Sequence, residues 1–185
     1  MSRPPQEGGV AARPADADDT LLVALSAVVL PGRDAPVAPQ DTAATLDRLE
    51  LTGRTVILAG RDVGGRRLPE DPDERDRWVR GTTGAAAIPV VSFEPPPWDH
   101  HEEGSEAAAV ARWDGLRVAQ RAAWLITDRP EDVRPARGSG LRVILVGPRG
   151  QDQPLATRPD LEARDLADAA RLLLAQDLFG SLPAG

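Results

Sequence analysis

Short apolar runs alternate with longer polar segments along most of the chain. The apolar runs cover residues 21–30, 55–59, 85–93, 122–127 and 141–146. Continuous apolar runs of this length, bounded by Pro, Gly or charged residues, are typical of strands that are buried on both faces. Since Pro89 lacks the N–H that a central strand would need, the third run predicts an edge strand or a strand that begins late.

The segments between these runs predict helices. Helices are expected at residues 41–51, 71–80, 105–116, 130–138 and 160–180. Asp41 can cap the first of them, and Gly53 follows that helix as a stop signal. Strands that alternate with helices predict an α/β fold. We expect a three-layer, Rossmann-like arrangement in which helices cover both faces of a five-stranded parallel sheet.

The chain length suits one folded domain. A single domain of 185 residues could bury about 70% of the surface that its unfolded chain exposes. We place this domain at residues 20–180. Residues 1–19 hold mainly Pro, Gly, Asp, Arg and Ala and cannot bury enough apolar area to offset ordering, so they predict a loose arm. Residues 181–185 are expected to form a C-terminal tail.

Charge and composition exclude several kinds of function. The chain carries 29 acidic residues against 22 basic ones, all arginine, and its formal charge is −7. This balance argues against a nucleic-acid partner, because binding to the phosphate backbone needs a basic stripe. The absence of cysteine excludes disulfides, thiolate zinc sites and iron–sulfur clusters. No apolar run reaches 18 residues and no apolar leader is found, so we expect no membrane partner and a cytoplasmic location.

The residues that follow the strands are candidates for chemistry, because ligands of open parallel sheets bind beyond the carboxyl ends of the strands. Asp128 and Asp132 follow the fourth run and lie four residues apart at the start of a predicted helix. Two carboxylates at this spacing could converge on one hard cation such as magnesium. On local signal alone, the favoured interpretation is structural: Asp128 caps the helix and Asp132 is solvated in its first turn.

Two loops hold weaker candidates. Arg61, Arg66 and Arg67 lie in a Gly-rich loop, where they could hold a phosphate or the acidic groups of a partner. Solvated loop arginines are the favoured alternative in an acidic protein. Residues 99–103 read Asp-His-His-Glu-Glu and could bind a metal ion, but adjacent histidines diverge in most backbones. An acidic surface loop or helix start is the favoured interpretation of this segment.

Several of these segments together resemble the haloacid dehalogenase-like (HAD) phosphatases. Residues 123–132 are similar to that family's fourth motif, in which a strand leads into two aspartates four residues apart. Residues 23–30 resemble the first motif. Residues 56–68 resemble the second-motif loop of the branch that contains histidinol-phosphate and heptose-bisphosphate phosphatases. The resemblance implies a cap-less HAD-like sheet whose strands, numbered along the chain, lie in the order 5-4-1-2-3.

The motif positions depart from the family's residue types. The family's nucleophilic Asp falls on Ala24, its acid/base Asp on Ser26, its phosphate-holding Thr or Ser on Ala59, and its Lys near Glu103. An alanine methyl can neither attack phosphorus nor bind magnesium, and the chain has no lysine. The resemblance therefore implies a pseudophosphatase without catalytic residues.

A pseudophosphatase would act by binding. The resemblance then implies a binding, regulatory or assembly protein, whose partner is another protein or a phosphorylated small molecule. No cofactor is expected. Asp128 and Asp132 keep their acids, so magnesium would bind there at most weakly.

An active enzyme is the alternative. Residues 16–20 read Asp-Ala-Asp-Asp-Thr, so Asp16 and Asp18 would supply a displaced first motif. That motif must follow a buried strand, and residues 10–15 form a poor one. The alternative implies a divergent magnesium-dependent phosphatase that acts on a sugar phosphate or histidinol phosphate. The two hypotheses differ in what stands at the carboxyl end of the first strand.

Overall fold

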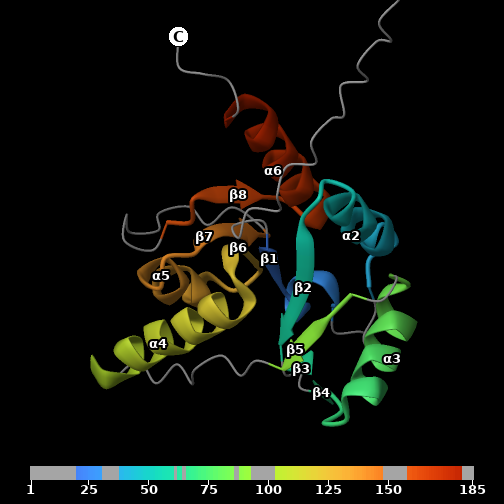
Figure 1. Cartoon of the computed structure of the whole chain (residues 1–185), viewed down its shortest axis with the longest axis horizontal. Helices are drawn as coiled ribbons and strands as arrows, with labels where there is room; N and C mark the ends of the chain where they lie inside the picture. Colours follow the sequence, from blue (N-terminus) through green and yellow to red (C-terminus); the bar gives the residue numbers. More distant parts are fainter. Residues whose placement is uncertain are drawn as a thin grey trace, which may run out of the picture.

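A six-stranded parallel sheet forms the centre of the molecule (Figure 1). The computed structural model describes residues 20–30, 38–60, 62–63, 66–85, 88–92, 103–147 and 158–180. In spatial order the sheet contains β5 (Val90–Ser92), β2 (Thr55–Gly60), β1 (Thr20–Ala24), β6 (Ala122–Thr127), β7 (Arg142–Val146) and β8 (Leu161–Ala163). Every pair of neighbouring strands in it is parallel.

The predicted strand order 5-4-1-2-3 is confirmed, and the sheet has one more strand than expected. This sixth strand, β8, lies outside β7 in a segment where the sequence predicted the start of the last helix. Its three residues include one buried side chain, Ala163, so the search for apolar runs did not detect it. The edge position of β5 is as expected: the strand begins directly after Pro89, whose carbonyl oxygen accepts a bond from Leu58 N at 2.9 Å.

Helices cover both faces of the sheet, which confirms the three-layer arrangement (Figure 1). One face carries α2 (Thr42–Glu50), α3 (Pro72–Thr83) and α6 (Leu166–Gly180), and the other carries α4 (Glu103–Gln120) and α5 (Pro130–Gly138). Each of these five helices overlaps a predicted one, although α4 and α3 extend further than expected and α6 begins later. Within the described ranges, none of the helices is long and apolar enough to cross a membrane.

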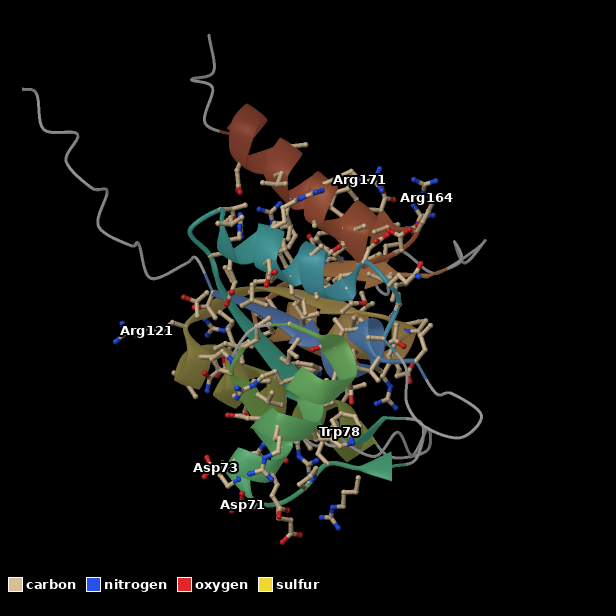
Figure 2. All side chains as sticks on the ribbon, turned by 90° about the vertical axis from the view of Figure 1, so that its right-hand side faces the viewer. Asp71, Asp73, Trp78, Arg121, Arg164 and Arg171 are labelled. Atoms are coloured by element: carbon tan, nitrogen blue, oxygen red, sulfur yellow. The ribbon has the colours of Figure 1, made fainter. Side chains whose placement is uncertain are left out.

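The boundaries of α3 illustrate how local sequence signals set a helix. Asp71 precedes the helix and its Oδ1 accepts a hydrogen bond from Glu74 N at 2.9 Å. Pro72 is the first helical residue, a position where its missing N–H is not needed. Gly84 ends the helix with a φ of 69°, which glycine adopts without strain. Asp71 and Asp73 lie at the outer end of this helix in Figure 2.

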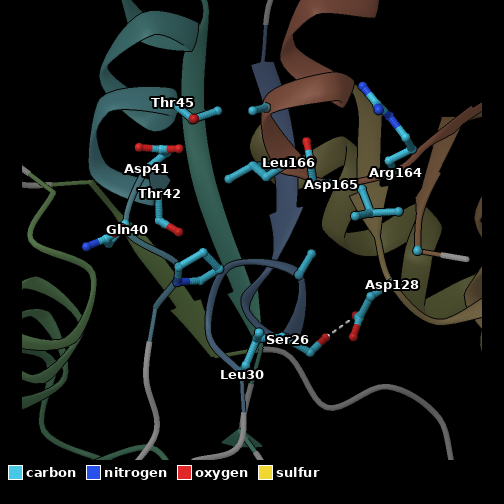
Figure 3. A pocket seen from close by; sticks show the side chains of 15 residues that line it. Ser26, Leu30, Gln40, Asp41, Thr42, Thr45, Asp128, Arg164, Asp165 and Leu166 are labelled. Carbon is cyan, nitrogen blue, oxygen red and sulfur yellow. Dashed lines mark hydrogen bonds between the residues drawn. The ribbon is translucent and has the colours of Figure 1, made fainter.

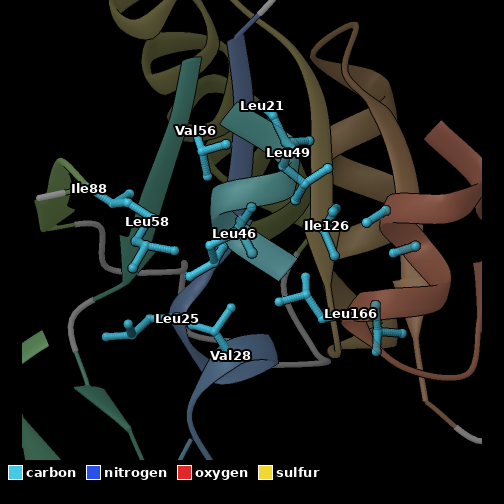
Figure 4. Close-up of a cluster of buried hydrophobic side chains, with 14 of the residues drawn as sticks. Leu21, Leu25, Val28, Leu46, Leu49, Val56, Leu58, Ile88, Ile126 and Leu166 are labelled. Carbon is cyan, nitrogen blue, oxygen red and sulfur yellow. The ribbon is translucent and has the colours of Figure 1, made fainter. Parts of the chain in front are cut away.

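The largest group of buried side chains lies between the sheet and the helices α2, α3 and α6 (Figure 4). Leu46 and Leu49 of α2 are fully buried there against Leu21, Val56 and Ile126 of the sheet. Each such side chain contributes about 1.5–3 kcal/mol to stability by leaving water. This packing fixes the end of β1 relative to the ends of its two neighbours.

The first apolar run is not one strand. Residues 21–30 were expected to be extended, but β1 ends at Ala24 and the helical turn α1 (Leu25–Val28) follows. The run stays apolar because the turn also faces the core, where Leu25 and Val28 are buried. A continuous apolar run does not distinguish these two conformations, because every residue is buried in both.

Gly60 allows α1 to lie against the end of β2. A Cβ on this residue would stand 2.8 Å from Leu25 Cβ, closer than real Cβ atoms come. Leu25 Cβ is held by the backbone, so it cannot move aside as a flexible side-chain end would. We therefore expect Gly60→Ala to lower the free energy of unfolding by about 1–3 kcal/mol, measured by urea denaturation.

Gly81 provides a matched control for this prediction. It lies in α3 with nothing within 4 Å of its would-be Cβ. Gly81→Ala should raise the free energy of unfolding by about 0.5–1 kcal/mol, since alanine loses less entropy in a helix. Equal effects of the two substitutions would contradict the close approach between α1 and β2.

The Gly-rich loop after β2 contains a short hairpin, and the chain ends are not described. The hairpin pairs β3 (Asp62–Val63) with β4 (Arg66–Arg67), where the sequence predicted only a loop. The expected arm at residues 1–19 and the expected tail at 181–185 lie outside the described residues.

Candidate functional site

Three strand ends meet at the centre of the sheet's carboxyl edge. Ala24 at the end of β1 pairs with Ala59 near the end of β2. On the other side, Val23 pairs with Ile126 of β6, so Ala24 lies beside the end of that strand. The edge therefore presents two buried methyl groups where parallel α/β sheets commonly bind ligands.

Ser26 and Asp128 join two of these strand ends directly. Ser26 is half-buried in α1, and its Oγ donates a hydrogen bond to Asp128 Oδ1 at 2.5 Å (Figure 3). Asp128 follows β6 and is exposed. A hydroxyl that is bonded to a carboxylate can help to position that carboxylate, but it supplies no negative charge of its own. This pair leaves Asp128 with one oxygen directed to other partners.

Asp132 lies below this edge and not on it. It is 2% exposed in the first turn of α5, and its Oδ2 accepts a bond from Thr127 Oγ1 at 3.1 Å. Among the described residues, its Oδ1 has no hydrogen-bond partner. Burial raises the pKa of Asp132 from 3.8 to about 6, although Arg129 and the Thr127 hydroxyl act to lower it.

Both structural expectations for this pair are wrong. Asp128 makes no capping bond to α5, because Thr127 Oγ1 accepts the bond from Arg129 N at 3.1 Å instead. Asp132 is buried and not solvated. Thr127, the last residue of β6, therefore bonds both to the start of α5 and to the Asp132 carboxylate.

The residues at this edge do not fit a magnesium ion. Magnesium takes near-ideal octahedral geometry with oxygen ligands. Here Asp128 is bonded to a hydroxyl, the neighbouring ends of β1 and β2 carry alanines, and Asp132 is buried in α5. Across the part of the chain that the structure describes, no three Asp, Glu or His side chains come together in a way that could hold a metal ion.

For most of the other predicted site residues, the side-chain position lies outside what the structure describes. Glu103 is the first residue of α4, whose side chain is not described there, and residues 99–102 lie outside the described residues. Arg61 also lies outside them, as do Asp16 and Asp18. Arg66 and Arg67 form β4, and the Arg67 side chain is exposed.

A pocket of about 350 Å³ opens beside the Ser26–Asp128 pair (Figure 3). Its walls come from the first turns of α2 and α6, from α1, and from the ends of β6 and β7. Sequence reasoning missed this pocket. Asp41 was expected to cap α2, but its side chain makes no bond to that helix. No local pattern signals that residues 41–45 and 164–167 face each other, because they lie over 100 residues apart.

Known proteins with a similar arrangement of strands and helices are found among the solved structures. No protein-family model matches the chain, and no curated protein matches it. Solved structures do match. The D,D-heptose 1,7-bisphosphate phosphatase of B. bronchiseptica, complexed with magnesium and phosphate, matches with a TM-score of 0.56 and 15% identity, over 85% of this chain and 99% of that one. The Burkholderia thailandensis enzyme of the same name gives 0.53 and 18%, over 85% and 99%.

A third solved structure is also similar to this chain. The cobalt-bound deoxy-D-mannose-octulosonate 8-phosphate phosphatase of Haemophilus influenzae gives a TM-score of 0.52 and 11% identity, over 92% of this chain and 95% of that one. The chain has the HAD-like fold. At these identities the likeness concerns the fold alone. Within the HAD-like sheet, β1 lies between β2 and β6, so the strand that resembles the first motif is central, as that motif requires.

Proposed function

We propose that this HAD-like chain does not transfer phosphoryl groups and acts instead as a binding, regulatory or assembly protein. One observation carries the proposal: the central strand β1 ends in the methyl group of Ala24. Covalent phosphoryl transfer at this place needs a nucleophile, and loss of an activated nucleophile in covalent enzymes costs about a million-fold in kcat. The partner class stays as proposed from the sequence, another protein or a phosphorylated small molecule.

Two neighbouring positions support the same proposal. Ala59 offers no hydroxyl that could hold a phosphoryl group next to Ala24. Ser26, in the place of a general acid and base, has an alcohol that stays protonated at neutral pH and is already bonded to Asp128. Each change alone would slow a phosphatase, and together they leave no path for proton or phosphoryl transfer among these residues.

Steady-state hydrolysis tests the proposal. The substrates are p-nitrophenyl phosphate, histidinol phosphate and D,D-heptose 1,7-bisphosphate, each with magnesium, and phosphate release is measured. The wild-type chain and Asp128→Asn should both stay at the rate of the protein-free solution. Metal-dependent turnover by the wild type that Asp128→Asn abolishes would overturn the proposal. It would favour the alternative, a divergent phosphatase with a displaced first motif.

A further inference from the structure

The pocket beside Ser26 has an apolar floor. Its volume of about 350 Å³ lies at the lower end of the range for small-molecule sites, about 300–1,000 Å³. The apolar side chains that line it come from four separate parts of the chain: Ala27, Leu30, Pro39, Val146, Leu166 and Ala167. Leu30 is about half exposed, so part of this apolar surface meets water when the pocket is empty. Such a floor favours the hydrocarbon part of a ligand.

The rim of the pocket is negatively charged. Among the described residues that line it, the carboxylates are Asp41, Asp128 and Asp165, and Arg164 is the cationic side chain. The Arg164 guanidinium lies 3.5 Å from Asp168 Oδ2 and is directed to the surface (Figures 2 and 3). The positive ends of α2 and α6 each contribute roughly half a unit charge, less than the carboxylates carry. The charges of the described lining residues therefore favour a cation in the pocket over an anion.

Two threonines with little exposed surface give the pocket hydroxyl groups. Thr42 and Thr45 are 3% and 7% exposed, and both line the pocket from the first turns of α2. Among the described residues these hydroxyls have no hydrogen-bond partner, so they are available to a ligand in the pocket. In Figure 3 both side chains stand on the wall that faces Leu166 and Asp165. A ligand with N–H donors would satisfy them together with the carboxylates.

We propose that this pocket binds a small organic ammonium, with the hydrocarbon body on the apolar floor and the charged nitrogen between Asp41, Asp165 and the threonine hydroxyls. An ammonium group only donates hydrogen bonds, and these groups all can accept them. The inference rests on the proposed function, since it treats this edge of the sheet as a place for binding and not for reaction. The two claims fail separately, because one is tested by hydrolysis and the other by binding.

Three probes of similar shape test the charge preference. Benzylammonium, benzyl alcohol and benzoate are titrated into the wild-type chain and followed by two-dimensional amide NMR. We expect benzylammonium to bind with a dissociation constant of about 1 mM, as suits so small a ligand, and to shift the amides of residues 41–45 and 164–167. Benzyl alcohol should bind roughly fivefold more weakly and benzoate more weakly still.

Substitutions in and outside the pocket test which side chains hold the ligand. Asp41→Asn should weaken benzylammonium roughly three- to tenfold and leave benzyl alcohol unchanged, whereas Asp47→Asn, on an exposed position of the same helix, should change neither. Thr45→Val should weaken benzylammonium roughly fivefold through the lost hydroxyl. Ala167→Phe should fill the pocket and abolish binding of both probes.

Several results would overturn this inference. These are benzyl alcohol binding as tightly as benzylammonium, benzoate binding more tightly, shifts confined to other residues, or no binding of benzylammonium by a chain that is folded by the same NMR spectra. Any of them leaves the hydrolysis result, and so the proposed function, unaffected. Equal effects of Asp41→Asn and Asp47→Asn would also overturn it, because they would trace the preference to overall charge.

Discussion

Replacing Ala24 with aspartate is expected to tighten magnesium binding at least about tenfold. Of the motif positions that the structure describes, only Asp128 offers magnesium an exposed carboxylate, so the dissociation constant should be about millimolar or weaker. Ala24 lies at the end of β1 beside the end of β6, so a carboxylate there adds a second negative charge near Asp128. Two opposite unit charges about 4 Å apart near a protein surface attract each other by about 4 kcal/mol. A tenfold gain in magnesium affinity requires only about 1.4 kcal/mol.

Isothermal titration with magnesium checks this expectation. The wild type, Ala24→Asp and the control Ala44→Asp, an exposed position on α2, are compared at the same ionic strength. Only Ala24→Asp should bind more tightly. Micromolar binding by the wild type would contradict the account and would favour Asp16 and Asp18 as the carboxylates of a displaced first motif.

The double change Ala24→Asp, Ser26→Asp should restore metal binding more readily than turnover. It supplies the two acids of the first motif, but Ala59 still lacks a hydroxyl and the chain still lacks lysine. We therefore expect this variant to bind magnesium and to hydrolyse p-nitrophenyl phosphate no faster than the wild type. The same samples serve for both measurements.

The free energy of unfolding is expected to depend on pH through Asp132. Its pKa is about 6 in the folded chain and about 3.8 when unfolded, so the folded state holds its proton more tightly. The stability that this gives is complete below pH 3.8 and is lost as the pH rises through 6. Between pH 5.0 and pH 7.5 the loss amounts to about 1–2 kcal/mol in the free energy of unfolding.

Asp132→Asn isolates this contribution. Asparagine keeps an oxygen that can accept the bond from Thr127, and it does not titrate. On going from pH 7.5 to pH 5.0, the wild type should gain about 1–2 kcal/mol in the free energy of unfolding relative to Asp132→Asn, measured by urea unfolding. The control Asp47→Asn, at an exposed position, should follow the wild type. Parallel profiles for wild type and Asp132→Asn would contradict the burial of an uncompensated carboxyl group.

The sequence predicted the sheet well because burial on both faces leaves a clear signal. The apolar runs at residues 55–59, 122–127 and 141–146 correspond closely to β2, β6 and β7. The edge strand β8 was missed because its residues are only partly apolar. The turn α1 was taken for a continuation of β1, since Leu25 and Val28 are as buried as the strand before them.

The sequence predicted where the candidate site lies in the sheet but not how its side chains and pocket are arranged. The sequence located Ala24, Ser26 and Asp128 at the carboxyl edge, and the structure places Ser26 in contact with Asp128. It did not predict that Asp132 is buried, because the helical spacing of two acids does not say which of them faces the core. Nor did it predict the pocket, whose walls meet only when α2 and α6 pack side by side.

Single-turnover chemistry tests the central claim most directly, because it registers even one phosphoryl transfer. The protein is mixed in excess over p-nitrophenyl phosphate with saturating magnesium, and release of p-nitrophenolate is followed. With a methyl group at the end of β1, release should proceed at the rate of the protein-free solution. A rapid magnesium-dependent release that the Asp128→Asn variant does not show would contradict the account.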